Sequence, residues 1–268
     1  MFYRRLNDEL FTSADLTNAF VGAPIFIVAA SPIINELPLG ELERSALPTL
    51  ALNNVLYSYP KPTMWLTADK PACYGGHFFA RADIIKFAYM NYRDDVVGAT
   101  GKPLKEHPMQ LFYNATEDKS AGFFSEEPAF IWWKSVFPLA LQLAWRLGSR
   151  RVYLVGCSFD NSSGAYAYAY ASKLNEFQAQ WSQLTYNDDV RRLRQFQAGF
   201  DERGFQLISC TPNSRANKFL PYHPLSDAIE AELRMMPQPT SISELKHSSE
   251  FRPRVGGTST GSGPRPSE

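Results

Sequence analysis

The sequence predicts an α/β fold: a Rossmann-like, mostly parallel sheet with helices on both faces. Two observations predict it. Short continuous apolar runs bounded by Gly, Pro or polar residues recur along the chain, as expected for strands buried on both faces of a parallel sheet. Helical segments alternate with the later runs. With 268 residues, 44% of them hydrophobic, the chain suffices for one such domain over residues 1–237.

The elements can be placed in order along the chain. Residues 1–23 form an amphipathic lead-in whose Phe2, Leu6, Leu10 and Phe11 are spaced to face a core. A weak helix or turn region covers 37–47. The apolar runs predict strands within 24–31, 49–54, 63–69, 82–90, 109–114, 152–156 and 205–209.

Three helices are predicted, at 129–147, 188–203 and 225–235. The first is apolar nearly all round and so buried, with Pro138 near its first turn and Gly148 as its stop. In the second, apolar side chains share one face and charged ones point outward. The apolar set is Val190, Leu193, Phe196 and Phe200, and the outward set is Arg191, Arg192, Arg194 and Glu202.

Two polar stretches have other interpretations. The turn-rich residues 94–108 would serve as an active-site lid or acceptor-binding loop or, equally, as a solvated surface excursion. Beyond Pro237 the composition shifts to Ser, Gly, Pro and Thr, which predicts a disordered tail over 238–268.

The composition excludes several classes of protein. Lys and Arg (27) balance Asp and Glu (27), so charge does not indicate a nucleic-acid partner, although it leaves one open. The amino terminus lacks the apolar core of a signal peptide, and no run reaches the ~18 apolar residues of a membrane span. Three scattered cysteines fit reduced thiols. We therefore expect a soluble, cytoplasmic protein.

Polar residues follow the predicted strands where ligands collect in open α/β sheets. Hydroxyls, amides and backbone N–H groups at strand ends suit the phosphate, ribose and base of a nucleotide. The stretch 151–170 carries the largest such loop, followed by Tyr166, Tyr168 and Tyr170, which alternate like a strand face. The strand-end residues are Ser31, Asn53, Asn54, Asp69, Ser158, Asp160, Asn213 and Ser214. No GxSxG, HExxH or P-loop lysine motif is present.

The order of these motifs resembles that of a known family. An apolar strand ending in AASP is followed by LNN, KPTMWLTAD, a long apolar helix, RRVYLVG and a late strand ending in CTPNS. Over about residues 24–220 the chain resembles the bacterial family 42 sialyltransferases and is similar to the related MptE-like (domain of unknown function 115) proteins. The closest local matches are GCSFDNSSGAYAY at 156–168 and SCTPNSRANKF at 209–219.

The resemblance implies a GT-A-variant fold that binds a cytidine or adenine nucleotide donor, such as a CMP-sugar. It implies that Asn53 holds the nucleotide and that the Tyr166 hydroxyl donates to the leaving phosphate. Asp69 matches an acidic residue that would hold Mg²⁺ between phosphates. Together with the strand-end positions, this gives the predicted nucleotide-binding set: Ala30, Ser31, Asn53, Gly156, Ser158, Asn213 and Ser214.

The chain departs from the family at three places. The glycine-rich first loop, GNGPS in the family, is AASPI at 29–33, which limits how closely backbone approaches a phosphate. A phosphate-binding tyrosine falls on Asp160, which repels a phosphate unless a cation intervenes. The family's catalytic histidine has no counterpart, because 161–222 contains no histidine. Asp69 or Asp160 would then act as base or metal ligand.

The leading hypothesis is a nucleotide-dependent transferase, glycosyltransferase-like, with Asp69, Asp160 and Tyr166 as catalytic residues. The alternatives are a Mg-ATP-dependent pyrophosphokinase-like enzyme, a non-catalytic binding module, and a nucleic-acid modifier on the same fold. The sequence specifies neither the acceptor nor the oligomeric state.

Overall fold

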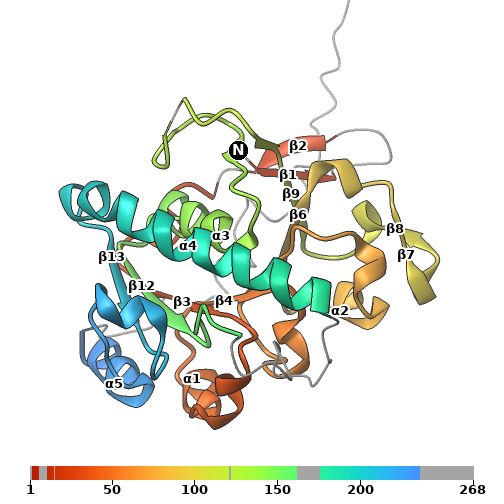
Figure 1. The fold of residues 1–268 in the computed structure, drawn as a ribbon. Helices are drawn as coiled ribbons and strands as arrows, with labels where there is room; N and C mark the ends of the chain where they lie inside the picture. The colour runs from red at the N-terminus through yellow and green to blue at the C-terminus, as the bar shows by residue number, and fades with distance from the viewer. Residues whose placement is uncertain (1, 6–10, 15, 121, 162–175, 236–268) are drawn as a thin grey trace, which may run out of the picture.

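The computed structural model describes the chain except residues 1, 6–10, 15, 121, 162–175 and 236–268. The predicted tail over 238–268 and the predicted tyrosine face of Tyr166, Tyr168 and Tyr170 lie outside the described residues. In the described part, the chain has the predicted α/β architecture, a mostly parallel sheet with helices on both faces (Figure 1).

Within the described residues, the main sheet has nine strands in the order β13-β12-β3-β4-β5-β6-β9-β1-β2. The strands from β13 to β9 pair in parallel, and each overlaps one of the predicted apolar runs. The strands are β1 (Phe2–Arg5), β2 (Phe11–Ala14), β3 (Ile25–Val28), β4 (Thr49–Leu52), β5 (Met64–Leu66), β6 (Ile85–Tyr89), β9 (Gln110–Tyr113), β12 (Arg151–Val155) and β13 (Gln206–Ser209). Two small sheets pair β7 (Val96–Val97) with β8 (Lys102–Pro103) and β10 (Ala115–Thr116) with β11 (Phe130–Ile131).

The amino-terminal segment forms an antiparallel edge of the main sheet. Strand β1 pairs with β9 on one side and with β2 on the other. Phe2 is buried and packs edge-on against Phe87, as a core-facing role requires. The amphipathic spacing predicted for this segment is thus realised as a strand pair, and Leu6 and Leu10 lie outside the described residues.

Helices cover both faces of the sheet. The α-helices are α1 (Leu39–Arg44), α2 (Gly76–Ala80), α3 (Val136–Arg146), α4 (Glu176–Glu202) and α5 (Leu225–Met235). Short 3-10 helices are η1 (Pro32–Glu36), η2 (Asn53–Tyr57), η3 (Pro71–Cys73), η4 (Met90–Tyr92), η5 (Gly98–Thr100), η6 (Leu104–Glu106) and η7 (Arg215–Lys218). Side chains of α3 and α4 share one hydrophobic cluster, and those of α1, α2 and α5 share another. None of the described helices is long and apolar enough to cross a membrane.

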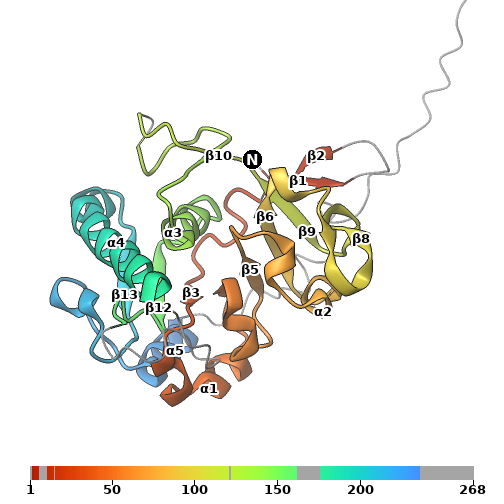
Figure 2. The same cartoon turned by 45° about the vertical axis from the view of Figure 1, so that its right-hand side comes forward.

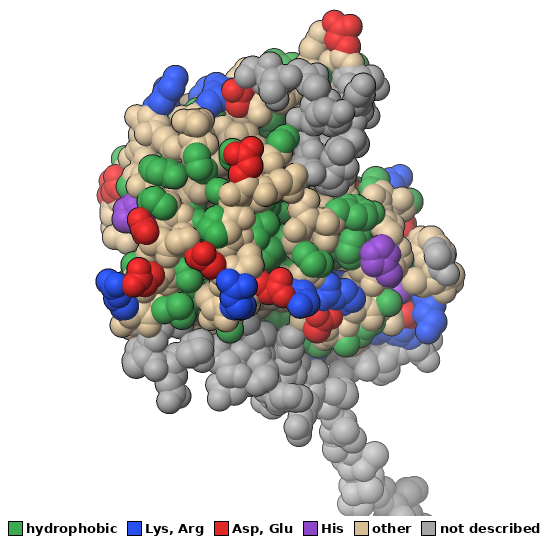
Figure 3. Space-filling view, turned by 90° about the horizontal axis from the view of Figure 1, so that it is seen from below, with side chains coloured by type: hydrophobic (Ala, Val, Ile, Leu, Met, Phe, Trp, Pro, Cys, Tyr) green, Lys and Arg blue, Asp and Glu red, His purple; other side chains and the backbone are tan. Residues whose placement is uncertain are grey.

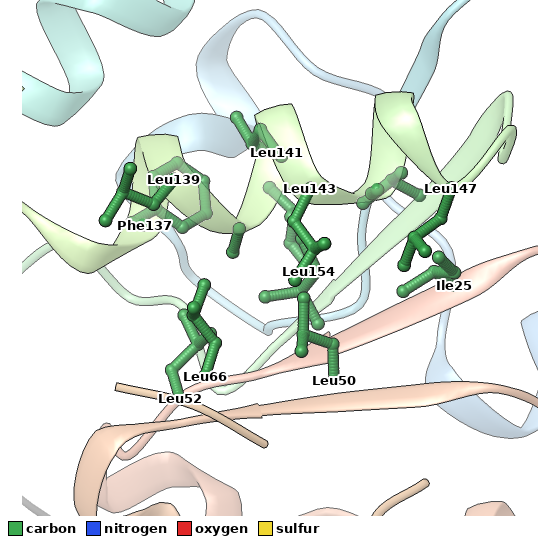
Figure 4. Close-up of a cluster of buried hydrophobic side chains, with 14 of the residues drawn as sticks. Ile25, Leu50, Leu52, Leu66, Phe137, Leu139, Leu141, Leu143, Leu147 and Leu154 are labelled. Atoms are coloured by element: carbon green, nitrogen blue, oxygen red, sulfur yellow. The ribbon is translucent and has the colours of Figure 1, made fainter. Parts of the chain in front are cut away.

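The two clusters lie on opposite faces of the sheet because side chains alternate along each strand. In β3, Ile25 and Ile27 belong to the α3 cluster, whereas Phe26 and Val28 belong to the other. Figure 4 shows strand side chains, Leu50 and Leu154 among them, meeting the leucines of α3. Each fully buried aliphatic side chain contributes roughly 1.5–3 kcal/mol, so this double core stabilises the sheet strongly.

Helix α3 begins later than predicted. Phe130 and Ile131 instead form β11, and Lys134 takes a left-handed backbone angle (φ +64°), which interrupts any helix through it. Ser135 then caps the helix by accepting a hydrogen bond from the Phe137 amide, and Pro138 falls in the first turn, as predicted. The helix ends before Gly148 (φ +90°), also as predicted.

Helix α4 is longer than predicted, and one of its arginines is buried although the hydrophobic pattern predicts it to point outward. The helix starts at Glu176 rather than near residue 188. Val190, Leu193 and Phe200 are buried as expected, but Arg192 is only 7% exposed. Its guanidinium pairs with Asp188 and Asp189 and donates to the Trp133 carbonyl oxygen, so the outward orientation predicted for Arg192 is wrong.

The polar stretch 94–108 folds as the small hairpin of β7 and β8 with its 3-10 turns. Val97 and Leu104 are fully buried and belong to the same hydrophobic cluster as side chains of α2 and β6. Figures 1 and 2 both show this hairpin on the β6–β9 side of the molecule.

The order of the strands reverses direction at β3. From β3 the chain continues to β4, β5, β6 and β9 on one side, and it returns later to place β12 and β13 on the other. Loops that leave β3 and β12 at their carboxyl ends therefore start next to each other and lead apart. Such a switch point is where open α/β sheets bind ligands.

Candidate functional site

A cleft of about 340 Å³ lies at the carboxyl ends of β3, β4, β5 and β12. The loops that follow these strands form one wall, and the amino end of α3 with part of α4 forms the other. Figures 1 and 2 show α3 and α4 side by side. The lining includes Ala30, Ser31, Asn53, Asp69, Gly156 and Ser158 from the predicted site, with Trp132, Lys134, Ser135, Trp181, Tyr186 and Asp189.

Two serine hydroxyls join the loops at the switch point. Ser31 occupies the cap position of η1, but its hydroxyl does not cap the helix. It donates instead to Ser158 Oγ over 2.8 Å, and Ser158 donates to the Asp160 carbonyl oxygen over 3.1 Å. Because hydroxyl protons rotate freely, this pair can turn toward a phosphate that enters the cleft.

Gly156 allows the two loops to approach. Its φ is +67°, and a Cβ built on it would lie 2.3 Å from the Ala29 carbonyl oxygen. The Gly156 carbonyl oxygen also accepts a hydrogen bond from the Ser31 amide over 3.2 Å. A residue without a side chain is therefore required where the two loops cross.

Asn53 combines a strained backbone with an unsatisfied amide. It has φ +47°, and its carbonyl oxygen accepts a 2.8 Å hydrogen bond from Trp65 Nε1. Its side-chain Oδ1 is buried and finds no hydrogen-bond partner among the described residues. Backbone strain and an orphaned polar atom both cluster at functional sites.

Asp69 carries an exposed carboxylate that a tyrosine orients. The Tyr74 hydroxyl donates to Asp69 Oδ2 over 2.8 Å and contacts Thr67 Oγ1, and Tyr113 donates to the Thr67 carbonyl oxygen. Burial, together with the charge of Asp69, raises the pKa of Tyr74 well above its usual value, so this tyrosine stays protonated as a donor. Among the described residues, the other carboxylate oxygen of Asp69 has no hydrogen-bond partner.

The opposite wall holds a buried carboxylate that the sequence did not single out. Asp189 on α4 is 2% exposed and accepts a 2.8 Å hydrogen bond from Ser135 Oγ, while Arg192 lies 3.5 Å from its other oxygen. Burial raises the pKa of Asp189 from 3.8 to about 7 despite these partners. The sequence signal that could have identified Asp189 was its position on the helix, next to Val190 and three residues before Arg192.

Three predicted residues lie near the cleft without lining it. Asp160 contributes its backbone to Ser158, and Asn213 is an exposed turn residue with φ +56°. Ser214 is buried, donates to the Cys157 carbonyl oxygen over 2.6 Å and caps η7. Ser214 thus holds the loop after β12 in place. The predicted catalytic Tyr166 lies outside the described residues.

The cleft can be tested for a fit to Mg²⁺. Among the described residues, no three His, Cys, Asp or Glu side chains come together as a metal site. Mg²⁺ bound with nucleotides commonly needs only one or two carboxylates, because phosphates and water complete its shell. Asp69, exposed and oriented by Tyr74, fits that lesser requirement.

Comparison with protein-family models, with curated proteins and with solved structures gave no match for this chain.

Proposed function

We propose that the protein is a nucleotide-dependent, glycosyltransferase-like enzyme that moves a group from a nucleotide-activated donor to an acceptor. The position of the cleft at the switch point of the sheet supports this function. So do its polar groups, because Ser31, Ser158 and Asn53 offer the hydroxyls and the amide that a nucleotide requires. A GT-A-variant classification of the fold is part of the proposal.

Each side chain of the cleft has a role in this proposal. Ser31, Ser158 and the cation Lys134 bind the phosphates, and Asn53 binds the nucleoside. Ala30 and Gly156 keep the backbone close to the ligand. Asp69 holds Mg²⁺ or accepts a proton. The first donor to test is a CMP-sugar. The free thiols of Cys73, Cys157 and Cys210 support a cytoplasmic location.

Asn53 is the observation that carries the proposal. A left-handed non-glycine residue costs on the order of 1–2 kcal/mol, somewhat less for Asn. A buried polar atom without a partner costs about 1–3 kcal/mol more. Both costs occur at one residue that faces a cleft, and a ligand that hydrogen-bonds the amide would offset the second.

Asp69 favours a second candidate, the Mg-ATP-dependent pyrophosphokinase-like reaction. Its exposed and oriented carboxylate suits a cation that bridges two phosphates. Activity that survives complete chelation of divalent metal would exclude this candidate and leave the glycosyltransferase-like one.

The charge distribution gives no support to a nucleic-acid modifier. On the face shown in Figure 3, acidic and basic side chains alternate along a band, and the whole chain has a net charge of zero. Nucleic-acid binding depends on clustered positive charge. A non-catalytic module would bind nucleotides in the cleft without turning any donor over.

The proposal is tested by Asn53→Gly in a thermal-shift screen of CMP, UDP, GDP, ATP and CMP-sugars, with and without Mg²⁺. For the wild type, one nucleotide at about a hundred times its Kd should add about 2.7 kcal/mol of stability. That amount raises Tm by roughly 5–10 °C for a domain of this size. Asn53→Gly should bind that nucleotide about tenfold more weakly, because the amide is lost.

Glycine accepts positive φ without strain, so Asn53→Gly should not lower Tm in the absence of ligand. Asn213→Gly is the matched control, because Asn213 also has positive φ (+56°) and does not line the cleft. No Tm shift of the wild type with any nucleotide, or equal affinity in Asn53→Gly, would contradict the proposal.

A further inference from the structure

The wall of the cleft opposite the sheet carries a second carboxylate, Asp189, for which the proposed function has no role yet. Helix α4 brings Trp181, Thr185 and Asp189 to the cleft at intervals of four residues, so one face of the helix lines it. Asp189 is the innermost of the three along this face and is 2% exposed. Ser135, at the amino end of α3, lies between α3 and this carboxylate.

The Ser135 hydroxyl links the amino end of α3 to Asp189 by hydrogen bonds. Its hydroxyl donates to Asp189 Oδ2 over 2.8 Å and accepts the Phe137 amide hydrogen over 3.2 Å. A hydroxyl oxygen has two lone pairs, so Ser135 Oγ retains one after both contacts. Because Ser135 lines the cleft, that lone pair can accept a hydrogen bond from a hydroxyl group bound there.

We propose that Ser135 and Asp189 form a proton relay that activates the acceptor hydroxyl of the transfer reaction. The inference rests on the proposed function. The acceptor oxygen forms a bond to the transferred group as the bond from that group to the nucleotide phosphate breaks, and the phosphate leaves with the electron pair. The acceptor proton moves to Ser135 Oγ while the Ser135 proton moves to Asp189 Oδ2, which becomes a neutral carboxylic acid.

The surroundings of Asp189 suit such a relay. Burial raises its pKa to about 7, a value at which a base is both ionised and basic enough near neutral pH. From α4, Arg192 favours the charged form at 3.5 Å and Asp188 opposes it. From the loop after β12, the Cys157 thiol is buried and its pKa is raised, so it stays neutral. From the start of α3, Ser135 stabilises the carboxylate, and Lys134 lies beside it in the chain.

The relay is tested by the pH profile of nucleotide release from the activated sugar that gives the largest thermal shift, with water or an added alcohol as acceptor. In the wild type, the rate should rise about tenfold per pH unit below about 7 and level off above it. Asp189→Asn should lower the rate about 100-fold and remove this rise, with nucleotide affinity unchanged within about twofold.

Three further variants separate the relay from structure. Asp201→Asn, an exposed aspartate on the same helix, should retain the wild-type rate and profile. Ser135→Thr keeps both the hydroxyl and the cap, and should retain most of the rate. Ser135→Gly keeps a favourable cap residue without the hydroxyl, and should lose the rate as Asp189→Asn does.

Stability against pH reports on Asp189 without any substrate. Its folded pKa is raised, so the folded state binds the proton more tightly and the wild type should lose stability as pH rises from about 4 to about 7. Asp189→Asn should not show this loss, and its urea midpoint also confirms that the variant folds. A wild-type rate and profile in Asp189→Asn, or in Ser135→Gly, would overturn the relay. So would a wild type that releases no nucleotide. If the nucleotides still shift Tm, a wild-type rate and profile in either variant removes the relay alone, whereas a wild type that releases no nucleotide also contradicts the transferase and leaves the non-catalytic module.

Discussion

Gly156→Ala is expected to destabilise the protein by at least about 3 kcal/mol. The added Cβ would lie 2.3 Å from the Ala29 carbonyl oxygen, a backbone atom that cannot turn aside, and 3.3 Å from Ile34 Cβ. The loop after β12 or the loop after β3 must move, and the hydrogen bond from the Ser31 amide to the Gly156 carbonyl oxygen moves with it. The same change should abolish nucleotide-induced thermal shifts, because it separates Ser31 from Ser158.

Gly204→Ala is the matched control for Gly156→Ala. Gly204 has nearly the same backbone angle (φ +62°), but apart from its chain neighbours no described residue has an atom within 4 Å of a Cβ placed there. Gly204→Ala should therefore destabilise the protein only by the backbone strain of alanine at this angle, about 1 kcal/mol. Urea unfolding of both variants measures the difference. Equal losses would show that the close approach at Gly156 does not restrain the site.

Glu232→Ala is expected to destabilise the protein by about 3–5 kcal/mol. Glu232 on α5 is fully buried and accepts hydrogen bonds from Arg151 Nε and Nη2 and from the Tyr153 hydroxyl, at 2.7–2.8 Å. The hydrogen bonds to Glu232, and the charge of that carboxylate, raise the pKa of Arg151, so the guanidinium stays charged in the pair. Without the carboxylate, the Tyr153 hydroxyl loses its acceptor in a buried position, and α5 loses its tie to β12.

Glu230→Ala, on the same helix, provides the comparison. Glu230 and Arg234 form an exposed ion pair four residues apart, which contributes at most about 0.5 kcal/mol. Urea unfolding of the two variants should give unfolding free energies that differ by several kcal/mol. A loss of unfolding free energy below about 1 kcal/mol for Glu232→Ala would contradict the stabilising role assigned to the ion pair of Glu232 and Arg151.

The parallel part of the sheet could be predicted because its strands carry their own signal. Ile25–Val28 and Thr49–Leu52 are buried along their whole length, so each reads as a continuous apolar run. Strands β1 and β2 carry no such run, and the pairing of β1 with β9 depends on a contact distant in sequence. For this segment the sequence indicated only an amphipathic spacing that places Phe2 against the core.

The starts of α3 and α4 were predicted poorly, each for a physical reason. Before α3, the apolar Phe130 and Ile131 suit a helix as well as a strand, and pairing with β10 decides between them. Along the first half of α4, Phe177, Trp181 and Leu184 are exposed, so no apolar core face marks that half as helical.

The sequence predicted the residues of only one of the two walls of the cleft. Ser31, Asn53, Asp69 and Ser158 lie within three residues of the ends of strands, and parallel strands bring their carboxyl ends to one edge. Asp189 lies in the middle of a helix, within a polar stretch where aspartate is ordinarily exposed. It is buried where it accepts a hydrogen bond from Ser135 of a distant segment, a contact that no local pattern encodes.

The central claim is that the cleft at the switch point binds a nucleotide. A crystal structure of the full chain with the nucleotide that gives the largest thermal shift tests it most directly. We expect density for the nucleotide in the cleft, with its phosphates within hydrogen-bond distance of Ser31 or Ser158 and its nucleoside at Asn53. Density for the same nucleotide elsewhere on the molecule, with an empty cleft, would contradict the account.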